Sequence, residues 1–401
     1  MFNSKSDISK AIAIYAILMF IANFNFTLIV PSIKEFVIEQ FNTNEVVASL
    51  FITVEMIAYI IFGMIWGALS DKQGKRKKFI VIGLAGSAVM YFTMTLANSL
   101  NLLIAFRFIQ GAISIMAWSL IMTSALDIAS KTSYGRVMGI IGMSMALGIS
   151  FGAPVGGKVA DSYGFLAPLY LASALFLMAT IISLKVKEHK VKHKPKSIFR
   201  YIKVLREKKK LAIPYAYGFV DRFTSGFFVF VFPLFMAEVH NASSGMRGMY
   251  LSIFLLPFAL LQYPFGKLSD KIGRTPPLVL GSLFYGILVG TIGFTVLIGQ
   301  EAKTALGLIM LGCGILAAMM FPPSIALAGD LAPKDKRGTA VGGFNVFGSL
   351  GFAIGPLLGG YIAYHYGYYW SFIIAGLSEV VIALITLPFL LKLKRRSIRV
   401  Q

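Results

Sequence analysis

Apolar runs of about 20 residues follow one another along almost the whole chain, and they limit the possible folds more than any other feature. Hydrophobic residues occupy 57% of the 401 positions and charged residues 14%, whereas soluble domains have roughly 45–50% and about 25%. In a bilayer, irregular backbone leaves amides and carbonyls unpaired, so each run is expected to be a helix. We therefore predict an all-α membrane protein. Its twelve transmembrane helices are centred near residues 21, 57, 88, 111, 148, 175, 224, 257, 287, 314, 350 and 380.

One loop pattern occurs twice, each time directly after an apolar run. Residues 67–76 read GALSDKQGKR and residues 266–274 read GKLSDKIGR, so a small-residue helix end, an acid, a turn glycine and basic residues recur in the same order. The two copies lie roughly 200 residues apart, about half the length of the chain. A duplicated membrane protein is therefore expected.

The duplication predicts two pseudo-symmetric six-helix bundles, residues 1–184 and 211–401, joined by a basic cytoplasmic linker of residues 185–210. Because six is even, both bundles enter the membrane from the same side, as parallel repeats about the membrane normal. Glycines recur at every fourth position of spans five and eleven, and we expect these stripes to permit close helix contacts between the bundles. The stripes are Gly148, Gly152 and Gly156, and Gly351, Gly355 and Gly359.

The formal net charge of +21 raises the possibility of a nucleic-acid partner, but the distribution of the charges favours a membrane topology. With both termini in the cytoplasm, all but six of the 38 lysines and arginines fall in cytoplasmic segments, which is the positive-inside pattern. We expect a multi-pass cell-membrane protein whose basic linker contacts anionic lipid headgroups, with no nucleic-acid partner.

Three motifs resemble those of the major facilitator superfamily, and the resemblance covers essentially the whole chain. Residues 67–76 resemble motif A of that family, with Gly67, Asp71, Gly74, Lys75 and Arg76 all in place. Residues 103–111, which include Arg107, Gln110 and Gly111, are similar to motif B, and the glycine stripe of span five resembles the antiporter-associated motif C. Its proline, Pro154, is displaced by one position relative to Pro356 of the second half.

The resemblance is to the twelve-span drug and metabolite proton-antiporter branch, and it implies a gate at the cytoplasmic face. In that family Asp71 would cap the N-terminus of span eleven, and the basic residue four positions on, Lys75, would pair with Asp127. The second half offers equivalent residues at the same places. These are Asp270, Gly273, Arg274 and Asp330.

Charged residues inside the spans are the sharpest indication of a mechanism, because each costs roughly 2.5–3.5 kcal/mol at mid-membrane on insertion scales. Asp221 lies about ten residues into span seven, which puts it about 15 Å deep at 1.5 Å per residue. We expect Asp221 to bind and release a proton while Arg107 faces the cavity and either holds a negative charge or displaces that proton; a fixed buried ion pair is the alternative. Arg222 points about 100° away from Asp221 around the helix, so the two side chains cannot face the same partner.

Two further acids lie within spans. Glu55, in span two, is expected to be either a second protonatable group or the partner of a tyrosine or an arginine. Glu379, in span twelve, is expected to be structural, or protonated and silent, because that span lies outside the cavity in the family.

Polar and aromatic residues on the spans that line the cavity in the family are candidate substrate contacts, and as a set they favour an amphipathic solute over a sugar. They are Asn23, Asn25, Gln110, Trp118, Gln262, Tyr263 and Asn345.

We therefore expect a monomeric secondary transporter that moves a small organic solute by alternating access, by proton-coupled efflux. A proton symporter that imports a sugar or organic acid is the main alternative, and a lipid flippase or a transporter-like sensor is a weaker one. No nucleophile lies beside a base, and no complete nucleotide-binding or metal-binding motif occurs, so neither an enzyme nor a cofactor or metal site is expected.

Overall fold

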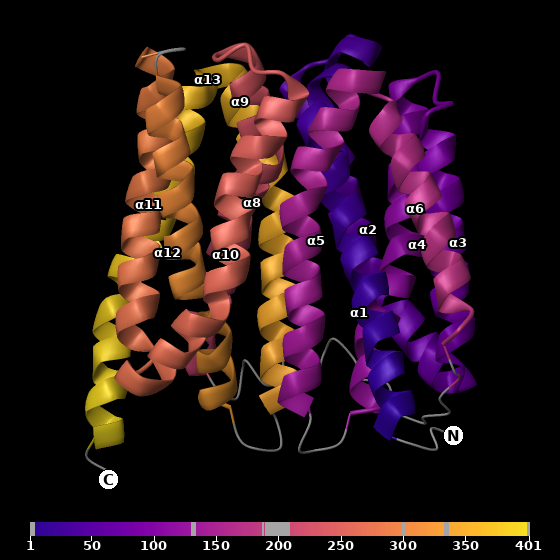
Figure 1. Cartoon of the computed structure of the whole chain (residues 1–401). Helices are drawn as coiled ribbons and strands as arrows, with labels where there is room; N and C mark the ends of the chain where they lie inside the picture. The colour runs from indigo at the N-terminus through magenta and orange to yellow at the C-terminus, as the bar shows by residue number, and fades with distance from the viewer. Residues whose placement is uncertain are drawn as a thin grey trace. The chain divides into compact units, whose positions relative to one another are not determined.

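The computed structural model describes residues 5–129, 134–186, 188, 209–298, 302–332 and 337–398, and these residues form helices and their connections (Figure 1). In the first half the elements are α1 (Lys5–Leu28), the 3₁₀ turn η1 (Val30–Ser32), the π-helix η2 (Lys34–Glu39), α2 (Glu45–Gln73), α3 (Arg76–Met94), α4 (Leu100–Asp127), α5 (Tyr134–Tyr163) and α6 (Ala167–Ser183). In the second half they are η3 (Lys209–Leu211), α8 (Ala212–Gly226), the π-helix η4 (Phe227–Val231), α9 (Phe232–Glu238), α10 (Ser244–Ile272), α11 (Thr275–Ile298), α12 (Lys303–Asp330) and α13 (Arg337–Ile398).

Ten of the described helical stretches are long and apolar enough to cross a membrane. The shorter helix α6, with 17 residues, is apolar along its length. The stretch Thr339–Lys392 counts as one of the ten, although Gly367, with φ 83° and ψ 166°, interrupts the helical backbone of α13. The chain is thus an all-helical protein of the membrane-spanning type.

A turn glycine directly follows α2 in the first half and α10 in the second half. Gly74 follows α2 with φ 63°, and Gly273 follows α10 with φ 91°. A residue with a Cβ is strained in this left-handed region, which is why both copies of the repeated loop contain glycine there.

Proline interrupts the helical backbone at equivalent places in the two halves. Pro31 lies in η1 directly after α1, and Pro233 lies in the first turn of α9 directly after η4. Proline lacks the amide proton that a continuous helix requires, so the regular hydrogen-bond ladder is locally lost. In the second half the resulting π-helix begins six residues after Asp221, and π-helical turns of this kind are frequent at functional sites.

Contacts within the chain define two compact units. The first comprises residues 1–196 and 242–252, and the second comprises residues 197–241 and 253–401. Most of the predicted basic linker, at 187 and 189–208, lies outside the described residues.

The glycine stripes form close contacts inside each unit. A Cβ at Gly148, Gly152 or Gly156 of α5 would collide with the backbone of α1, and one at Gly351 or Gly355 of α13 would collide with the backbone of α8. Because these glycines have no side chain, α5 can approach α1 closely and α13 can approach α8 closely, as small residues permit between membrane helices. The expectation that these stripes join the two bundles is wrong for these five positions.

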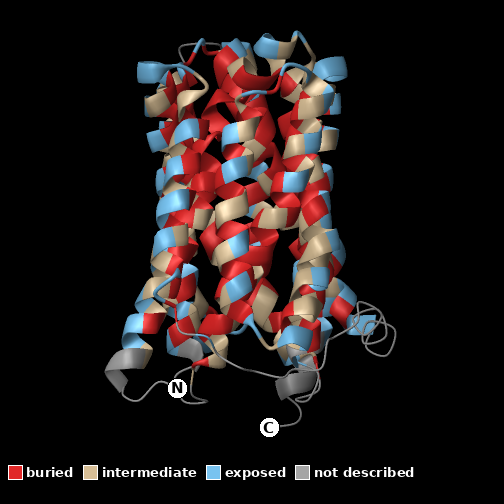
Figure 2. Ribbon diagram, turned by 90° about the vertical axis from the view of Figure 1, so that its right-hand side faces the viewer, coloured by how far each residue is buried: buried red, intermediate tan, exposed pale blue. Residues whose placement is uncertain are grey.

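Buried and exposed residues alternate around most helices, with the buried faces turned toward neighbouring helices (Figure 2). In the second unit α11 and the C-terminal part of α13 approach especially closely, because a Cβ on Gly286 would meet the backbone of Gly376 and the Cβ of Glu379. This crossing seals the region around Glu379, whose side chain is 0% exposed.

Candidate coupling and substrate site

Helix α8 carries the two charged residues expected at mid-span, and their side chains have different surroundings. The Arg222 guanidinium donates to the Asn345 side-chain oxygen at 3.1 Å and lies 5.9 and 5.8 Å from the ring centres of Phe321 and Phe344. Asp221 is half-buried, and its carboxylate has no hydrogen-bond or ion-pair partner among the described residues. The two neighbours therefore attract each other electrostatically but do not form an ion pair, and the carboxylate of Asp221 can accept another partner.

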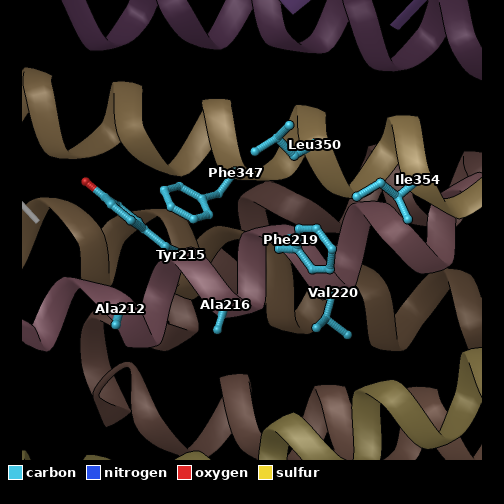
Figure 3. A pocket seen from close by; sticks show the side chains of 8 residues that line it. All are labelled: Ala212, Tyr215, Ala216, Phe219, Val220, Phe347, Leu350 and Ile354. Atoms are coloured by element: carbon cyan, nitrogen blue, oxygen red, sulfur yellow. The ribbon is translucent and has the colours of Figure 1, made fainter. Parts of the chain in front are cut away.

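An apolar pocket of about 380 Å³ lies between α8 and α13 in the second unit (Figure 3). The Tyr215 and Phe347 rings stack at its margin, with their centres 5.2 Å apart. The side chains around it are aromatic and aliphatic, which suits an apolar part of an organic solute better than a sugar. The lining residues are Ala212, Tyr215, Ala216, Phe219, Val220, Phe347, Leu350 and Ile354.

In the first unit Arg107 is the centre of a buried polar network. It is 0% exposed, and its Nη2 lies 2.5 Å from the Glu55 carboxylate. It also donates to the Gln110 side-chain oxygen at 3.0 Å and stacks on Phe51 with 4.5 Å to the ring centre. Such a set of partners satisfies a cation in a low-dielectric interior. The expectation that Arg107 faces a cavity is therefore wrong for this conformation, because Glu55 and the surrounding helices enclose it.

Glu55 was expected to be either a second protonatable group or the partner of a tyrosine or an arginine, and in the structure it contacts one of each. Its carboxylate accepts from the Tyr59 hydroxyl at 3.2 Å in addition to Arg107. Beyond it, Gln110 donates to Ser114 at 2.5 Å, and Ser114 contacts Ser87 at 2.8 Å. The network thus crosses α2, α4 and α3.

A small cavity of about 20 Å³ adjoins this network, with Tyr59, Gln110, Ser114 and Trp118 in its wall. That is the space that one water molecule requires. This cavity is therefore too small for an organic solute.

The remaining predicted cavity residues lie in different environments. Asn25 is 0% exposed and donates to the Ala172 carbonyl at 3.4 Å, so it joins α1 to α6 and is not a cavity residue here. Asn23 is buried and bonds to the Met19 carbonyl of its own helix. Gln262 is half-buried, whereas Tyr263 is 79% exposed within the chain.

The first copy of the repeated loop forms a charge cluster in which Arg76, not Lys75, is the central cation. Its Nε lies 2.5 Å from Asp127 and its Nη2 lies 3.0 Å from Asp71. Lys75 is exposed at the N-cap of α3, so the predicted pairing of Lys75 with Asp127 is wrong. A guanidinium presents several donors in a plane and bridges two carboxylates, which an ammonium does less well.

Glu188 completes this cluster, although no residue pattern around it predicted this role. Its carboxylate accepts from the Arg76 amide at 2.6 Å and from the Lys77 amide at 3.2 Å, at the start of α3. An acid at this position satisfies unpaired amides and the positive end of the helix dipole.

The second copy uses the residue that corresponds to Lys75. Arg274 bonds to Asp330 with Nε at 3.1 Å, and through Nη1 to Asp270 and, at 2.8 Å, to Ser269. The two halves therefore build equivalent clusters with cations from adjacent positions of the motif. Asp330 is 52% exposed, so the second cluster is the more hydrated of the two.

The sequence did not predict a further ion pair in the first unit. It lies at the helix ends opposite to those that carry the repeated loop. The Arg247 guanidinium, 3% exposed, bonds to both oxygens of Glu35 and, through Nη1, to the Pro31 carbonyl at 2.6 Å. Sequence alone placed Arg247 in an external loop, and nothing in the residues near it indicated a distant acid.

Comparison with known proteins identifies this arrangement of helices and motifs. The family model for the Major Facilitator Superfamily matches residues 15–220 and 215–400. An uncharacterized MFS-type transporter of Methanocaldococcus jannaschii is 26% identical over 80% of this chain and 83% of that protein. The multi-drug resistance efflux pump PmrA of Streptococcus pneumoniae is 23% identical over 81% of each. The crystal structure of a D-xylose-proton symporter has a similar fold, with a TM-score of 0.76 at 17% identity, and the match covers 93% of this chain and 95% of that one.

The fold and the two matched halves define a membrane transporter and not an enzyme. The chain belongs to the major facilitator superfamily, which confirms the resemblance found in its motifs.

Proposed function

We propose that this transporter exports a small amphipathic organic solute in exchange for protons, and that Asp221 is the group that binds the proton. The observation that carries the proposal is the Asp221 carboxylate itself, which is half-buried within a helix, forms no ion pair or hydrogen bond among the described residues, and interacts with the neighbouring Arg222 only electrostatically. An intramembrane acid without a fixed partner is expensive to keep and typical of proton relays.

Two more features support an amphipathic solute. The pocket beside α8 is apolar, and Arg222 and Asn345 supply polar groups on the same helices. A multi-drug resistance efflux pump is among the relatives, and export by that protein agrees with an export role here.

In this proposal the twelve spans form two six-helix bundles that alternate access, with both termini cytoplasmic in the cell membrane and the chain acting as a monomer. The Arg76 and Arg274 clusters hold the cytoplasmic side closed when their ion pairs are formed, and open when these pairs break. The Glu55 and Arg107 pair keeps the first bundle charge-neutral while it moves.

Proton symport is the second candidate, because the D-xylose-proton symporter shares the fold and a single acid serves either direction. The two candidates predict opposite solute movements.

The test begins with a thermal-shift screen of the purified protein against drugs, sugars, amino acids, nucleosides and lysolipids, since a ligand of the native state raises its apparent stability. The strongest hit is then assayed in proteoliposomes under an imposed pH gradient. Antiport predicts uphill solute movement toward the side that supplies protons. Movement of solute and protons in the same direction would establish symport and overturn export.

A further inference from the structure

Glu379 is the one fully buried carboxyl group of the described residues that forms no ion pair. It lies in the C-terminal part of α13, where its Oε2 accepts from the Ser282 hydroxyl of α11 at 2.6 Å. Its Oε1 lies 3.2 Å from the Thr224 hydroxyl of α8. An ionised carboxylate without a cation is costly at such a place, because burial removes its hydration.

The hydrogen atoms available at this site indicate which form of Glu379 it fits. Each hydroxyl can donate only one hydrogen bond. Thr224 Oγ1 lies 2.8 Å from the Val220 carbonyl, which is the shorter of its two contacts and takes its proton. The remaining contact with Glu379 Oε1 is then a hydrogen bond only if the carboxyl group supplies the proton.

The neutral acid therefore satisfies both of its oxygens. In that form Oε2 accepts from Ser282, and the proton on Oε1 lies toward Thr224 Oγ1, whose oxygen is 3.2 Å from Oε1. The ionised form has only the Ser282 donor, unless Thr224 turns its proton away from Val220 and leaves that carbonyl with one partner fewer.

Among the described residues, the titratable groups that interact with Glu379 are another acid and two tyrosines, and no basic side chain is among them. Asp221 and Tyr217 on α8 and Tyr285 on α11 interact electrostatically with it. The Tyr217 hydroxyl is bonded to Thr386 at 2.9 Å. Asp221 and Thr224 are three residues apart and thus on the same face of α8, which links the two acids through one helical turn.

We infer that Glu379 is a second proton-binding site of this transporter, occupied by a proton in this conformation and linked to Asp221. Thr224 and Ser282 are its positioning residues. On release, the Oε1–H bond breaks, the proton passes to water or to the Asp221 carboxylate, and Glu379 keeps the electron pair as a carboxylate. The link to Asp221 rests on the proposed function, whereas the proton on Glu379 does not.

Infrared spectroscopy of the purified protein tests the proton directly, through the C=O stretching band of protonated carboxyl groups near neutral pH. Glu379→Gln should remove one carboxyl from this band and retain the thermal unfolding transition. The matched control is Glu55→Gln, which removes an equally buried acid that is paired with Arg107 and should leave the band unchanged. A band unchanged in Glu379→Gln, or reduced equally in both variants, would overturn the inference.

Changes at Thr224 keep the inference testable even if Glu379→Gln does not fold. Thr224→Val removes the acceptor of the carboxyl proton and should shift the band, while Thr224→Ser keeps the hydroxyl and should restore its position. A band at the same frequency in the Val variant would contradict the proposed hydrogen bond.

A separate measurement tests whether proton binding at Glu379 is linked to Asp221. Asp221→Asn should change the pH at which the Glu379 band disappears, and an unchanged pH would refute the link. If Asp221→Asn keeps coupled transport while Glu379→Gln loses the band, the proposed function fails and the Glu379 proton site remains.

Discussion

Arg76 and Lys75 are adjacent cations of the same motif with opposite environments. Arg76 is 4% exposed and bridges Asp71 and Asp127, whereas Lys75 is exposed. We expect Arg76→Ala to lower the free energy of unfolding by about 3 kcal/mol, because it leaves two carboxylates without their cation. Lys75→Ala should change it by less than about 0.5 kcal/mol. Equal effects in thermal or denaturant unfolding in detergent would refute the assignment of the central cation.

His240 provides a pH dependence outside the spans. Burial, followed by the positive charge of Lys303, lowers the pKa of this imidazole below its usual 6.5, and it packs edge-on against Phe235 with ring centres 4.9 Å apart. The unfolded chain therefore binds more protons than the folded one below about pH 6.5, and stability falls as the pH is lowered through that range.

The corresponding measurement is the melting temperature between about pH 7.5 and 5.5. The loss of stability on acidification should be smaller in His240→Leu than in the unmodified protein, and it should persist in the control His365→Gln at an exposed position. A pH dependence that is the same in His240→Leu would contradict this account.

Among the helices, α11 and the C-terminal part of α13 depend on glycine for their close approach. A Cβ at Gly286 would meet backbone atoms of Gly376, while one at Gly290, a turn further along α11, would have only the end of the Ile373 side chain at 4.0 Å. Gly286→Ala should therefore destabilise the protein by about 1–3 kcal/mol through overpacking. Gly290→Ala should be neutral or slightly stabilising in the same unfolding assay. The reverse order would show that these helices do not cross at Gly286.

The start of α10 is fixed to the segment after α1 by Arg247 and Glu35. Because Arg247 is almost fully buried, Glu35→Gln should cost about 3 kcal/mol of stability by leaving its guanidinium without a counter-ion. The neighbouring pair of the half-buried Lys34 and the exposed Glu39, 3.4 Å apart, is a natural control, and Glu39→Gln should cost less than about 0.5 kcal/mol. A double-mutant cycle with Arg247→Gln measures the coupling, and a value near zero would contradict the contact.

The helical character of the apolar runs was predictable from the sequence, but the irregular turns within them were not. Apolar runs located the spans because period and length are local properties of the chain. The π-helix η4 depends on how the hydrogen bond that is missing at Pro233 is redistributed through the preceding turn, which a residue pattern does not specify. The π-helix η2 contains no proline, and the residue pattern did not indicate it.

For the molecule as a whole, the family and the recurring loops followed from local motifs, whereas long-range pairings did not. Asp71, Asp127 and the cations beside them were identified from the repeat, but which cation is buried depends on the path of the backbone at the N-cap of α3. The partner of Glu55 was left open because one of its partners, Tyr59, lies four positions away on the same helix, whereas the other, Arg107, lies 52 positions away on α4. Nothing in the sequence around Glu379 indicated that hydroxyl groups on α8 and α11 contact its carboxyl group.

The central claim is that Asp221 carries the proton that drives transport. Its most direct test compares the unmodified protein, Asp221→Asn and the control Glu39→Gln in proteoliposomes, with the solute found by the thermal-shift screen. The account predicts that Asp221→Asn loses uphill transport under an imposed pH gradient but keeps exchange of labelled for unlabelled solute, while Glu39→Gln keeps both. Uphill transport in Asp221→Asn at the rate of the unmodified protein would contradict it.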